Sequence, residues 1–271
     1  MTAQRITVNL DEIREIAHKG VRRAAVFLGL GLNAAYDSAL KEYRLSKIAN
    51  IDLVPPDADE KTIASYKEEF SYWIIANGLR ELVETFSVFL DQIHESFLLF
   101  KFTKGQLSRP QALEQRKKFH YAGLSDKLAT LKEEFVLEPE KADHLISINR
   151  ARNCLTHRRG IVGTKDVDKD KTLHMKWTGM EVFVKTPSGG EIPLIPGDFR
   201  EPIEVKDGGD VMLRFLERSK TFKFGERVLL SPVDMAEICQ VFAHEANNLC
   251  NRALERSREF GITNLKEEKP V

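Results

Sequence analysis

One segment near the middle of the chain concentrates residues that can move protons and bind phosphate. Residues 150–160 read RARNCLTHRRG and so contain four arginines, one histidine and one asparagine. RNA carries its own nucleophile in the 2′-hydroxyl, so cleavage needs a base for that proton, an acid for the departing 5′ oxygen and a cation for the phosphorane. Histidine suits both proton transfers because its unperturbed pKa of about 6.5 makes both forms available near neutral pH. Arginine suits the phosphorane because its planar fork forms two hydrogen bonds with phosphate oxygens.

Arg152 and His157 do not share a face if the segment is an unbroken helix. Their separation of five positions corresponds to about 500° of rotation, so the side chains point about 140° apart. Either the helix unwinds before His157, which Gly160 permits, or the same segment of a second subunit completes the site. A two-fold dimer would place two arginines and two histidines around one cleft, providing a separate acid and base. Asn153 could position either side chain.

This segment resembles the R-x4-6-H motif of the HEPN superfamily, in which a polar residue often follows the arginine directly. The resemblance implies Arg152 and His157 as the catalytic pair and Asn153 as the accompanying polar residue. Arg150 also fits the motif, with six residues before the same histidine, so the choice of motif arginine stays open. The family likeness further implies a homodimer and metal-independent endoribonuclease activity that needs no cofactor.

HEPN proteins are helical bundles, and the likeness covers roughly residues 20–160 and 231–260. Many members belong to toxin, antiviral or RNA-processing systems, which implies RNA as substrate and an antitoxin or other regulatory protein as partner. Others have lost catalysis and bind RNA, a nucleotide or a protein. A catalytically inactive binding module is therefore the alternative function.

Three further arginines, Arg150, Arg158 and Arg159, are predicted to contact RNA phosphates. A simpler explanation is that cations at the carboxyl end of a helix are stabilised by the helix dipole, by a few tenths of a kcal/mol each. The bundle would then be only a structural or dimerisation scaffold. With 41 Lys and Arg against 41 Asp and Glu the net charge is zero, which excludes a strongly basic nucleic-acid coat protein. RNA binding would depend on local charge.

Apolar residues recur at three- and four-residue steps through the first half of the chain, which predicts helices. We expect helices over residues 21–43, 61–100, 126–135, 139–160 and 231–260, with Asp59, Ser125 and Ser231 as caps and a further short helix start at Ser108 within an irregular stretch at 101–124. Gly29 and Gly31 suggest close approach by a neighbouring element. Phe70 and Trp73 fall on the apolar stripe of the second helix.

The period changes after Gly160. Short β-branched or apolar segments occur at 172–177, 181–185, 191–195, 211–216 and 227–230, and glycine-rich turns separate several of them. We predict a mainly α fold with an antiparallel β-rich insertion before the last helix. Residues 1–160 and 230–262 would form a discontinuous HEPN-like bundle, 161–229 the insertion and 263–271 a flexible tail.

No metal site is predicted. Asp166, Asp168 and Asp170 imitate the opening of a calcium loop, but the turn glycine is missing and Trp177 occupies the position of the bidentate glutamate, so a solvated loop is expected. The sequence contains neither a Walker A motif nor a His-Glu-x-x-His motif.

The cysteines and the apolar runs indicate a cytoplasmic protein that does not associate with membranes. The three cysteines, Cys154, Cys239 and Cys250, form no even-numbered disulfide framework and are expected to be reduced and buried. Charges interrupt the first apolar residues, which argues against a signal peptide. The longest apolar run, residues 24–32, is too short to span a bilayer.

Overall fold

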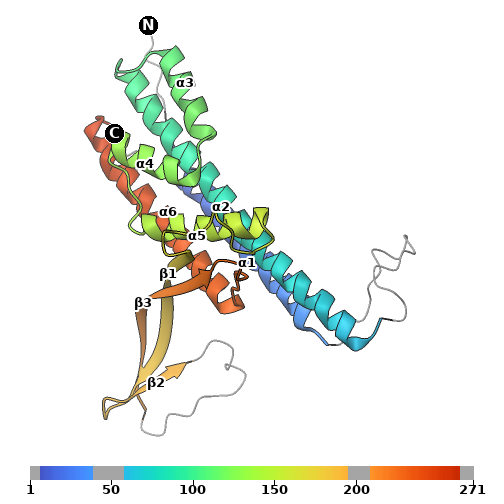
Figure 1. Ribbon diagram of the computed structural model, residues 1–271. Coiled ribbons are helices and arrows are strands. Elements are labelled where there is room, and N and C mark those ends of the chain that lie inside the picture. Colours follow the sequence, from blue (N-terminus) through green and yellow to red (C-terminus); the bar gives the residue numbers. More distant parts are fainter. Residues whose placement is uncertain (1–6, 39–57, 195–207, 263–271) are drawn as a thin grey trace, which may run out of the picture.

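The computed structural model describes residues 7–38, 58–194 and 208–262. These ranges contain six helices and three strands (Figure 1). The elements are α1 (Leu10–Tyr36), α2 (Glu60–Thr103), α3 (Arg109–His120), α4 (Leu124–Phe135), α5 (Ala142–His157), β1 (Thr172–Lys185), β2 (Glu191–Leu194), β3 (Asp210–Lys223) and α6 (Pro232–Glu259). Among the described residues, no helix has a stretch apolar enough to cross a membrane.

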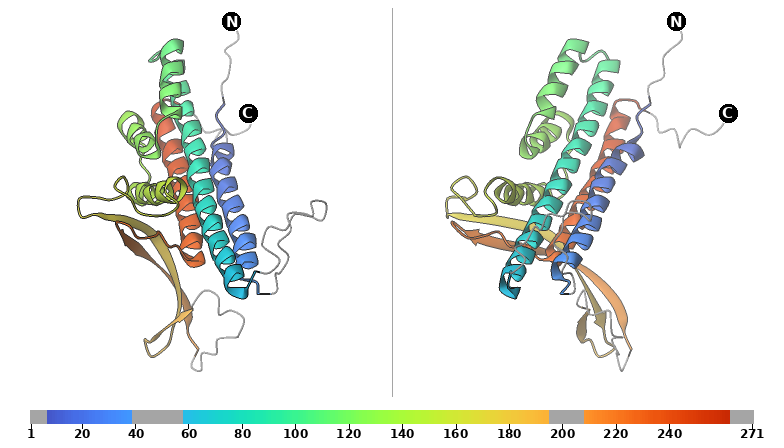
Figure 2. Two further views of the ribbon diagram at one scale, coloured as in Figure 1. Left: turned by 45° about the vertical axis from the view of Figure 1, so that its right-hand side comes forward. Right: turned by 90° about the vertical axis from the view of Figure 1, so that its right-hand side faces the viewer.

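Three long helices, α1, α2 and α6, run side by side and form the body of the molecule, and α3, α4 and α5 lie along the other side of α2 (Figure 2). Each long helix begins at a side chain that accepts hydrogen bonds from otherwise free backbone N–H groups. These caps are Asn9 for α1, Asp59 for α2 and Ser231 for α6. Asp234 completes a capping box with Ser231.

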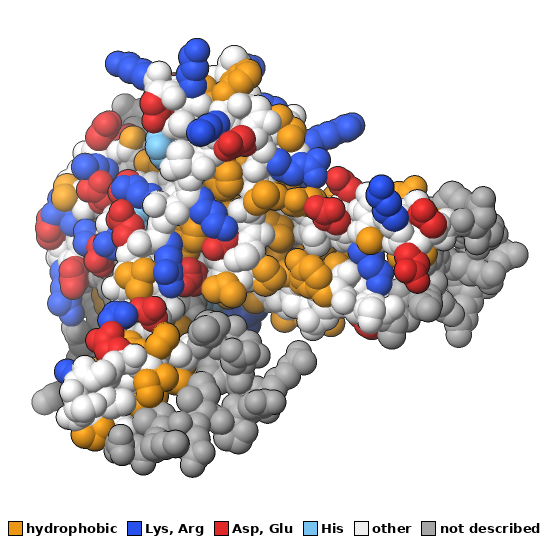
Figure 3. All heavy atoms as spheres, turned by 60° about the horizontal axis from the view of Figure 1, so that its bottom comes forward, with side chains coloured by type: hydrophobic (Ala, Val, Ile, Leu, Met, Phe, Trp, Pro, Cys, Tyr) orange, Lys and Arg blue, Asp and Glu red, His pale blue; other side chains and the backbone are white. Residues whose placement is uncertain are grey.

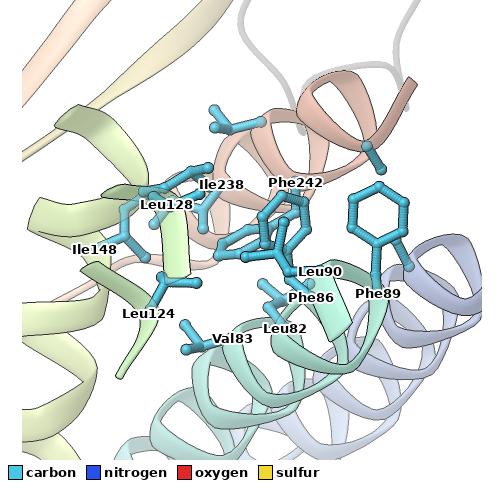
Figure 4. Packing of buried hydrophobic residues seen from close by; sticks show 14 of the residues in the cluster. Leu82, Val83, Phe86, Phe89, Leu90, Leu124, Leu128, Ile148, Ile238 and Phe242 are labelled. Carbon is cyan, nitrogen blue, oxygen red and sulfur yellow. The ribbon is translucent and has the colours of Figure 1, made fainter. Parts of the chain in front are cut away.

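Aromatic residues of α2 fill the space between the helices. Phe86 is buried and meets Phe242 of α6 edge to face, with ring centroids 5.3 Å apart. Leu128 of α4 and Ile148 of α5 join the same cluster (Figure 4). This packing holds α5, which carries the candidate segment, against the centre of α2 and α6.

The sheet lies between α5 and α6 in the chain and has the strand order β2-β1-β3, with antiparallel pairing throughout. One end of the sheet joins the helical core, where Trp177 is buried and its Nε1 donates to Glu237 at 2.7 Å. The hydroxyl of Ser147 in α5 donates to the backbone carbonyl of Lys176 and accepts from the backbone N–H of the same residue. The other end extends away from the helices (Figures 1 and 2).

The predicted mainly α fold with an antiparallel sheet before the last helix is confirmed. The long helices expected at 61–100 and 231–260 are present with their predicted caps. The separate strands expected at 172–177 and 181–185 form one strand, because β3 pairs with β1 along its whole length. The strand expected at 227–230 is reduced to a single bridge between Arg227 and Ile161.

Helix boundaries differ from expectation mainly where another cap operates. α1 begins at Leu10 because Asn9 caps it, and it ends at Tyr36 because the backbone of Asp37 is extended. The predicted cap Ser125 lies inside α4, which follows Gly123. The irregular stretch contains the full twelve-residue α3, stabilised by a capping box from Ser108. The predicted flexible tail lies outside the described residues.

Candidate functional site

The candidate segment occupies the end of α5 and the turn that follows. α5 remains helical as far as His157, and Arg158 caps it. Gly160 adopts a left-handed φ of 75°, and its N–H donates to the carbonyl of Cys154 at 3.1 Å, which satisfies an acceptor at the helix end. The helix therefore does not unwind before His157. Of the two arrangements considered above, unwinding of the helix is therefore wrong, and completion by a second subunit stays a prediction.

Arg152 is half-buried between α5 and α2. Its Nη1 donates to Oδ1 of Asn153 at 2.9 Å, while its Nε is buried and has no hydrogen-bond partner among the described residues. Burial lowers the pKa of Arg152, an effect that Glu84 opposes and Arg80 reinforces. Asn153 thus orients a guanidinium that still has donors to offer.

His157 and Arg159 are exposed and available to a ligand. Over the described ranges neither side chain makes a hydrogen bond or an ion pair with the protein. Arg159 has a left-handed φ of 52° in the turn that leads to Gly160. The structure thus places His157 at the surface, on a different side of α5 from Arg152.

Arg150 and Arg158, both predicted to bind RNA, are engaged within the protein. The Nε of Arg158 donates to Asp166 at 2.6 Å, and this hydrogen bond raises the pKa of Arg158. Arg150 binds both carboxylate oxygens of Asp168, at 3.0 and 2.9 Å, and the carbonyl of Asp166 at 2.8 Å. These contacts hold the loop after α5 against the helix, and they leave Arg152 and Arg159 as the arginines of the segment without a carboxylate partner among the described residues.

The expectation of a solvated loop at Asp166 is wrong. Asp166 is only 2 % exposed and also accepts a hydrogen bond from the N–H of Gly163 at 2.9 Å. The loop folds back over the end of α5, so its first carboxylate is buried opposite Arg158, the residue that caps that helix. In the sequence, aspartates at positions 166, 168 and 170 follow soon after the arginine-rich end of α5. This spacing was the signal for the pairing.

One group of side chains in the described part of the chain has the spacing of a metal site. Ligand atoms of Asp168, Asp170 and His174 lie within 4.8 Å of one another, and all three residues are exposed. Asp168 is also the partner of Arg150, and Asp170 Oδ2 lies 2.8 Å from Nε2 of His174. His174 is not among the residues singled out from the sequence, although it lies four positions after Asp170. If the activity of the protein proves to require a metal ion, this group is the candidate site for that ion.

The three cysteines are free and buried, as predicted. Burial raises the pKa of Cys154 and Cys239 to about 11 and that of Cys250 to about 12. Thiolate chemistry is therefore disfavoured at all three positions.

An apolar surface, which we call the α1–α2 face, lies on the projecting part of the two-helix hairpin. Its exposed members are Phe27 and Leu30 of α1 and the stacked pair Phe70 and Trp73 of α2, and they border a groove of about 580 Å³. Trp73 is 60 % exposed. Figure 3 shows hydrophobic side chains gathered next to the protruding part of the molecule. Phe70 and Trp73, which the sequence places on the apolar stripe of this helix, are exposed, because α1, the helix that packs against this stretch of α2 in the described part of the chain, leaves them uncovered.

Gly31 allows the two helices of this face to approach closely. A Cβ atom at Gly31 would lie 2.5 Å from Cδ1 of Ile74, so the predicted close approach is confirmed there. Gly29 faces open space, so the same expectation is wrong for that residue.

The α1–α2 face adjoins the candidate segment. Arg80 and Glu84, which influence the pKa of Arg152, also line the groove. On the other side Arg227, which pairs with Ile161 just after the segment, reaches Glu69 of α2 at 3.2 Å and lies over the ring of Tyr72. The same stretch of α2 therefore carries exposed apolar side chains and flanks the segment that holds Arg152 and His157.

No protein-family model matches the sequence, and neither a curated protein nor a solved structure matches it.

Proposed function

We propose that the protein is a HEPN-type, metal-independent endoribonuclease whose active site is shared by two copies of the chain. The observation that supports this most directly is the arrangement around α5. Arg152 has no carboxylate partner among the described residues and His157 is exposed, yet the unbroken helix points them apart. The uncovered α1–α2 face beside them offers a surface on which a second copy would supply the missing residues.

In the proposed reaction His157 of one copy removes the proton from the 2′-hydroxyl, whose oxygen attacks the adjacent phosphorus. His157 of the other copy donates a proton to the departing 5′ oxygen, leaving a 2′,3′-cyclic phosphate and a free 5′-hydroxyl. Arg152 donates to the phosphorane oxygens, and Asn153 holds its guanidinium in place. Arg159 is exposed and contributes to binding the RNA backbone.

A second function, an inactive HEPN module that binds RNA, a nucleotide or a protein, is favoured by the pairing of Arg150 and Arg158. Only Arg152 and Arg159 in the segment then remain to contact phosphate. Two such contacts correspond to a log–log salt slope of roughly −1.4 per copy on single-stranded RNA. RNA binding with a shallow slope of this kind, but without cleavage, would support the inactive module. Both the active ribonuclease and the inactive module are compatible with a toxin or antiviral role and with an antitoxin or other regulatory protein as partner.

The direct test is cleavage of RNA by the purified protein in EDTA, with the 2′,3′-cyclic phosphate ends assayed. We expect His157→Ala and Arg152→Ala each to lower the rate by about 10²–10³-fold, because each removes a group that acts in the transition state. His244→Ala and Arg252→Ala, at exposed positions of α6, serve as matched controls and should cleave normally.

A requirement for a divalent cation would contradict the mechanism. It would direct attention to the exposed metal-like group, which Asp170→Asn and His174→Ala would then probe. Full activity of His157→Ala in EDTA would contradict the assignment of the base.

A further inference from the structure

A second cavity, of about 670 Å³, lies where the sheet meets the helical body. Its walls come from the start of α5, from β1 and β3, and from the middle of α6. His144 of α5 lies thirteen residues before His157, about 20 Å along the helix, so this cavity is separate from the proposed ribonuclease site. Its volume is within the usual range of small-molecule sites.

The carboxylate of Glu245 lines this cavity and has no fixed partner. Glu245 is 0 % exposed, and neither of its oxygens makes a hydrogen bond with any described residue. Burial raises its pKa. The backbone N–H groups of Lys141 and Glu140, which lie near the carboxylate but outside hydrogen-bond geometry, and the nearby His244 partly oppose this effect. A buried carboxyl group without a hydrogen-bond donor is destabilising, so the position favours a ligand that supplies one.

The neighbouring polar groups also indicate a donor-bearing, positively charged ligand. Glu140, Glu217 and Glu245 line the cavity together with Lys141, His144 and His244. Glu217 lies 3.4 Å from His144 and Glu140 lies 3.8 Å from His244, so Glu245 is the lining carboxylate without an ion-pair partner among the described residues. The unfilled position at Glu245 is an acceptor, which disfavours an anion.

Apolar side chains form the rest of the wall. Met180 of β1, Phe215 and Leu216 of β3, and Val241 of α6 line the cavity. They provide a surface for a hydrocarbon or aromatic body attached to the charged group. A bare inorganic cation would leave this surface unused.

We propose that this cavity binds a small organic cation, in which an ammonium group donates to Glu245 and an apolar body packs against Met180 and Phe215. The ammonium group supplies the donors that the carboxylate lacks, and the acidic rim attracts its charge. The inference is independent of the proposed ribonuclease activity, because it involves neither Arg152 nor His157.

Calorimetric titration of the full chain with three probes of similar shape tests this proposal. The probes are phenethylamine, the neutral 2-phenylethanol and the anionic 3-phenylpropionate. We expect saturable binding of phenethylamine, at least tenfold weaker binding of the alcohol and no binding of the acid. Glu245→Gln should weaken amine binding about 10- to 100-fold, the value of a hydrogen bond to a charged group, and leave alcohol binding unchanged.

Glu255→Gln, at an exposed carboxylate of the same helix, is the matched control and should bind like the parent protein. Met180→Trp narrows the cavity while leaving Glu245 in place, so it should also abolish amine binding. Circular dichroism establishes that each variant is folded. Equal affinity for amine and alcohol, unchanged amine affinity in folded Glu245→Gln, or absence of amine binding to the parent protein would each overturn the proposal.

Discussion

Arg152 differs from Arg150 and Arg158 in having no carboxylate partner among the described residues. Arg150 and Arg158 bind the carboxylates of Asp168 and Asp166, whereas Arg152 contacts Asn153 and keeps a buried Nε without a described partner. This difference favours Arg152 over Arg150 as the motif arginine. The choice of motif arginine stays a prediction, which the variants below test.

The guanidinium fork of Arg152 should matter beyond its charge. Arg152→Lys keeps a cation but cannot form two parallel hydrogen bonds with phosphate, so we expect cleavage to fall about 10²-fold or more. Arg159→Lys, at an exposed position, is the control and should change the rate by less than about threefold, since exposed charge pairs contribute little. Initial rates on a labelled RNA measure both. A rate near that of the parent protein in Arg152→Lys would indicate that only the charge of Arg152 matters.

A single side chain, His94, is expected to make the free energy of unfolding depend on pH. Its ring stacks on Phe119 with centroids 3.9 Å apart, and its Nδ1 is buried without a described partner. Burial, together with Lys101 and Lys127, lowers its pKa from 6.5 to about 4. Between these values the unfolded chain binds a proton that the folded chain does not, so the free energy of unfolding falls as the pH decreases from 6.5 to about 4.

His94→Phe should remove this contribution while keeping the ring stack. We expect the variant to gain stability relative to the parent protein as the pH is lowered through that window, and the difference to level off above pH 6.5 and below about pH 4. Urea unfolding at a series of pH values measures the difference. A constant difference from pH 7 to 4 would show that His94 titrates alike in the folded and unfolded states.

At the scale of elements, a buried ion pair joins α4 to α2. Lys127 of α4 is 2 % exposed, and its Nζ donates to Asp91 at 2.6 Å and to the hydroxyl of Ser87 at 2.7 Å. His120, at the end of α3, approaches the other oxygen of Asp91 at 3.0 Å. One carboxylate of α2 therefore contacts the two short helices that follow it in the chain.

Loss of Asp91 should be far more destabilising than loss of the whole pair. Asp91→Ala leaves the Lys127 ammonium buried and unpaired, for which we expect about 3–5 kcal/mol of destabilisation. Adding Lys127→Met removes the charge and should recover most of that loss, because apolar residues of similar volume replace buried ion pairs well. Chemical denaturation of the single and double variants measures the coupling free energy between Asp91 and Lys127. Additive losses would contradict the role assigned to the pair.

The sequence predicted the helices and their caps better than it predicted which side chains the fold buries. Asp59, Ser231 and Gly160 act within one turn of their own helix, so their roles could be derived from neighbouring residues. The burial of Asp166 depends on a loop folding back over α5, and the exposure of Trp73 depends on where the helices that cover α2 end. Both are consequences of tertiary packing, which hydrophobic periodicity does not contain. The motif residues were visible in the sequence, but their free or paired donors were not.

At the scale of the whole molecule, the proposed activity depends on self-association through the α1–α2 face. We expect the protein to be dimeric and Trp73→Glu to weaken the dimer by about 2 kcal/mol or more, roughly thirtyfold in dissociation constant, as for a central aromatic residue of an interface. Sedimentation equilibrium measures the change. Leu113→Glu places the same charge on an exposed apolar position of α3 and should leave the dimer intact. An unchanged dimer in Trp73→Glu would place the interface elsewhere.

Mixing inactive variants distinguishes a shared site from two separate ones. A mixed dimer of Arg152→Ala and His157→Ala chains has one intact arginine and one intact histidine, contributed by different subunits. If both residues meet in one cleft, the mixed dimer combines one arginine with one histidine, so co-incubation should raise cleavage above that of either variant alone. The rate should stay below that of the parent protein, because the second histidine of the proposed mechanism is missing. Sites built within single chains would stay inactive because each still lacks one group. Introducing Trp73→Glu into both chains should prevent the recovery, since the mixed dimer no longer forms. Recovery that persists with this substitution would mean that another surface brings the chains together.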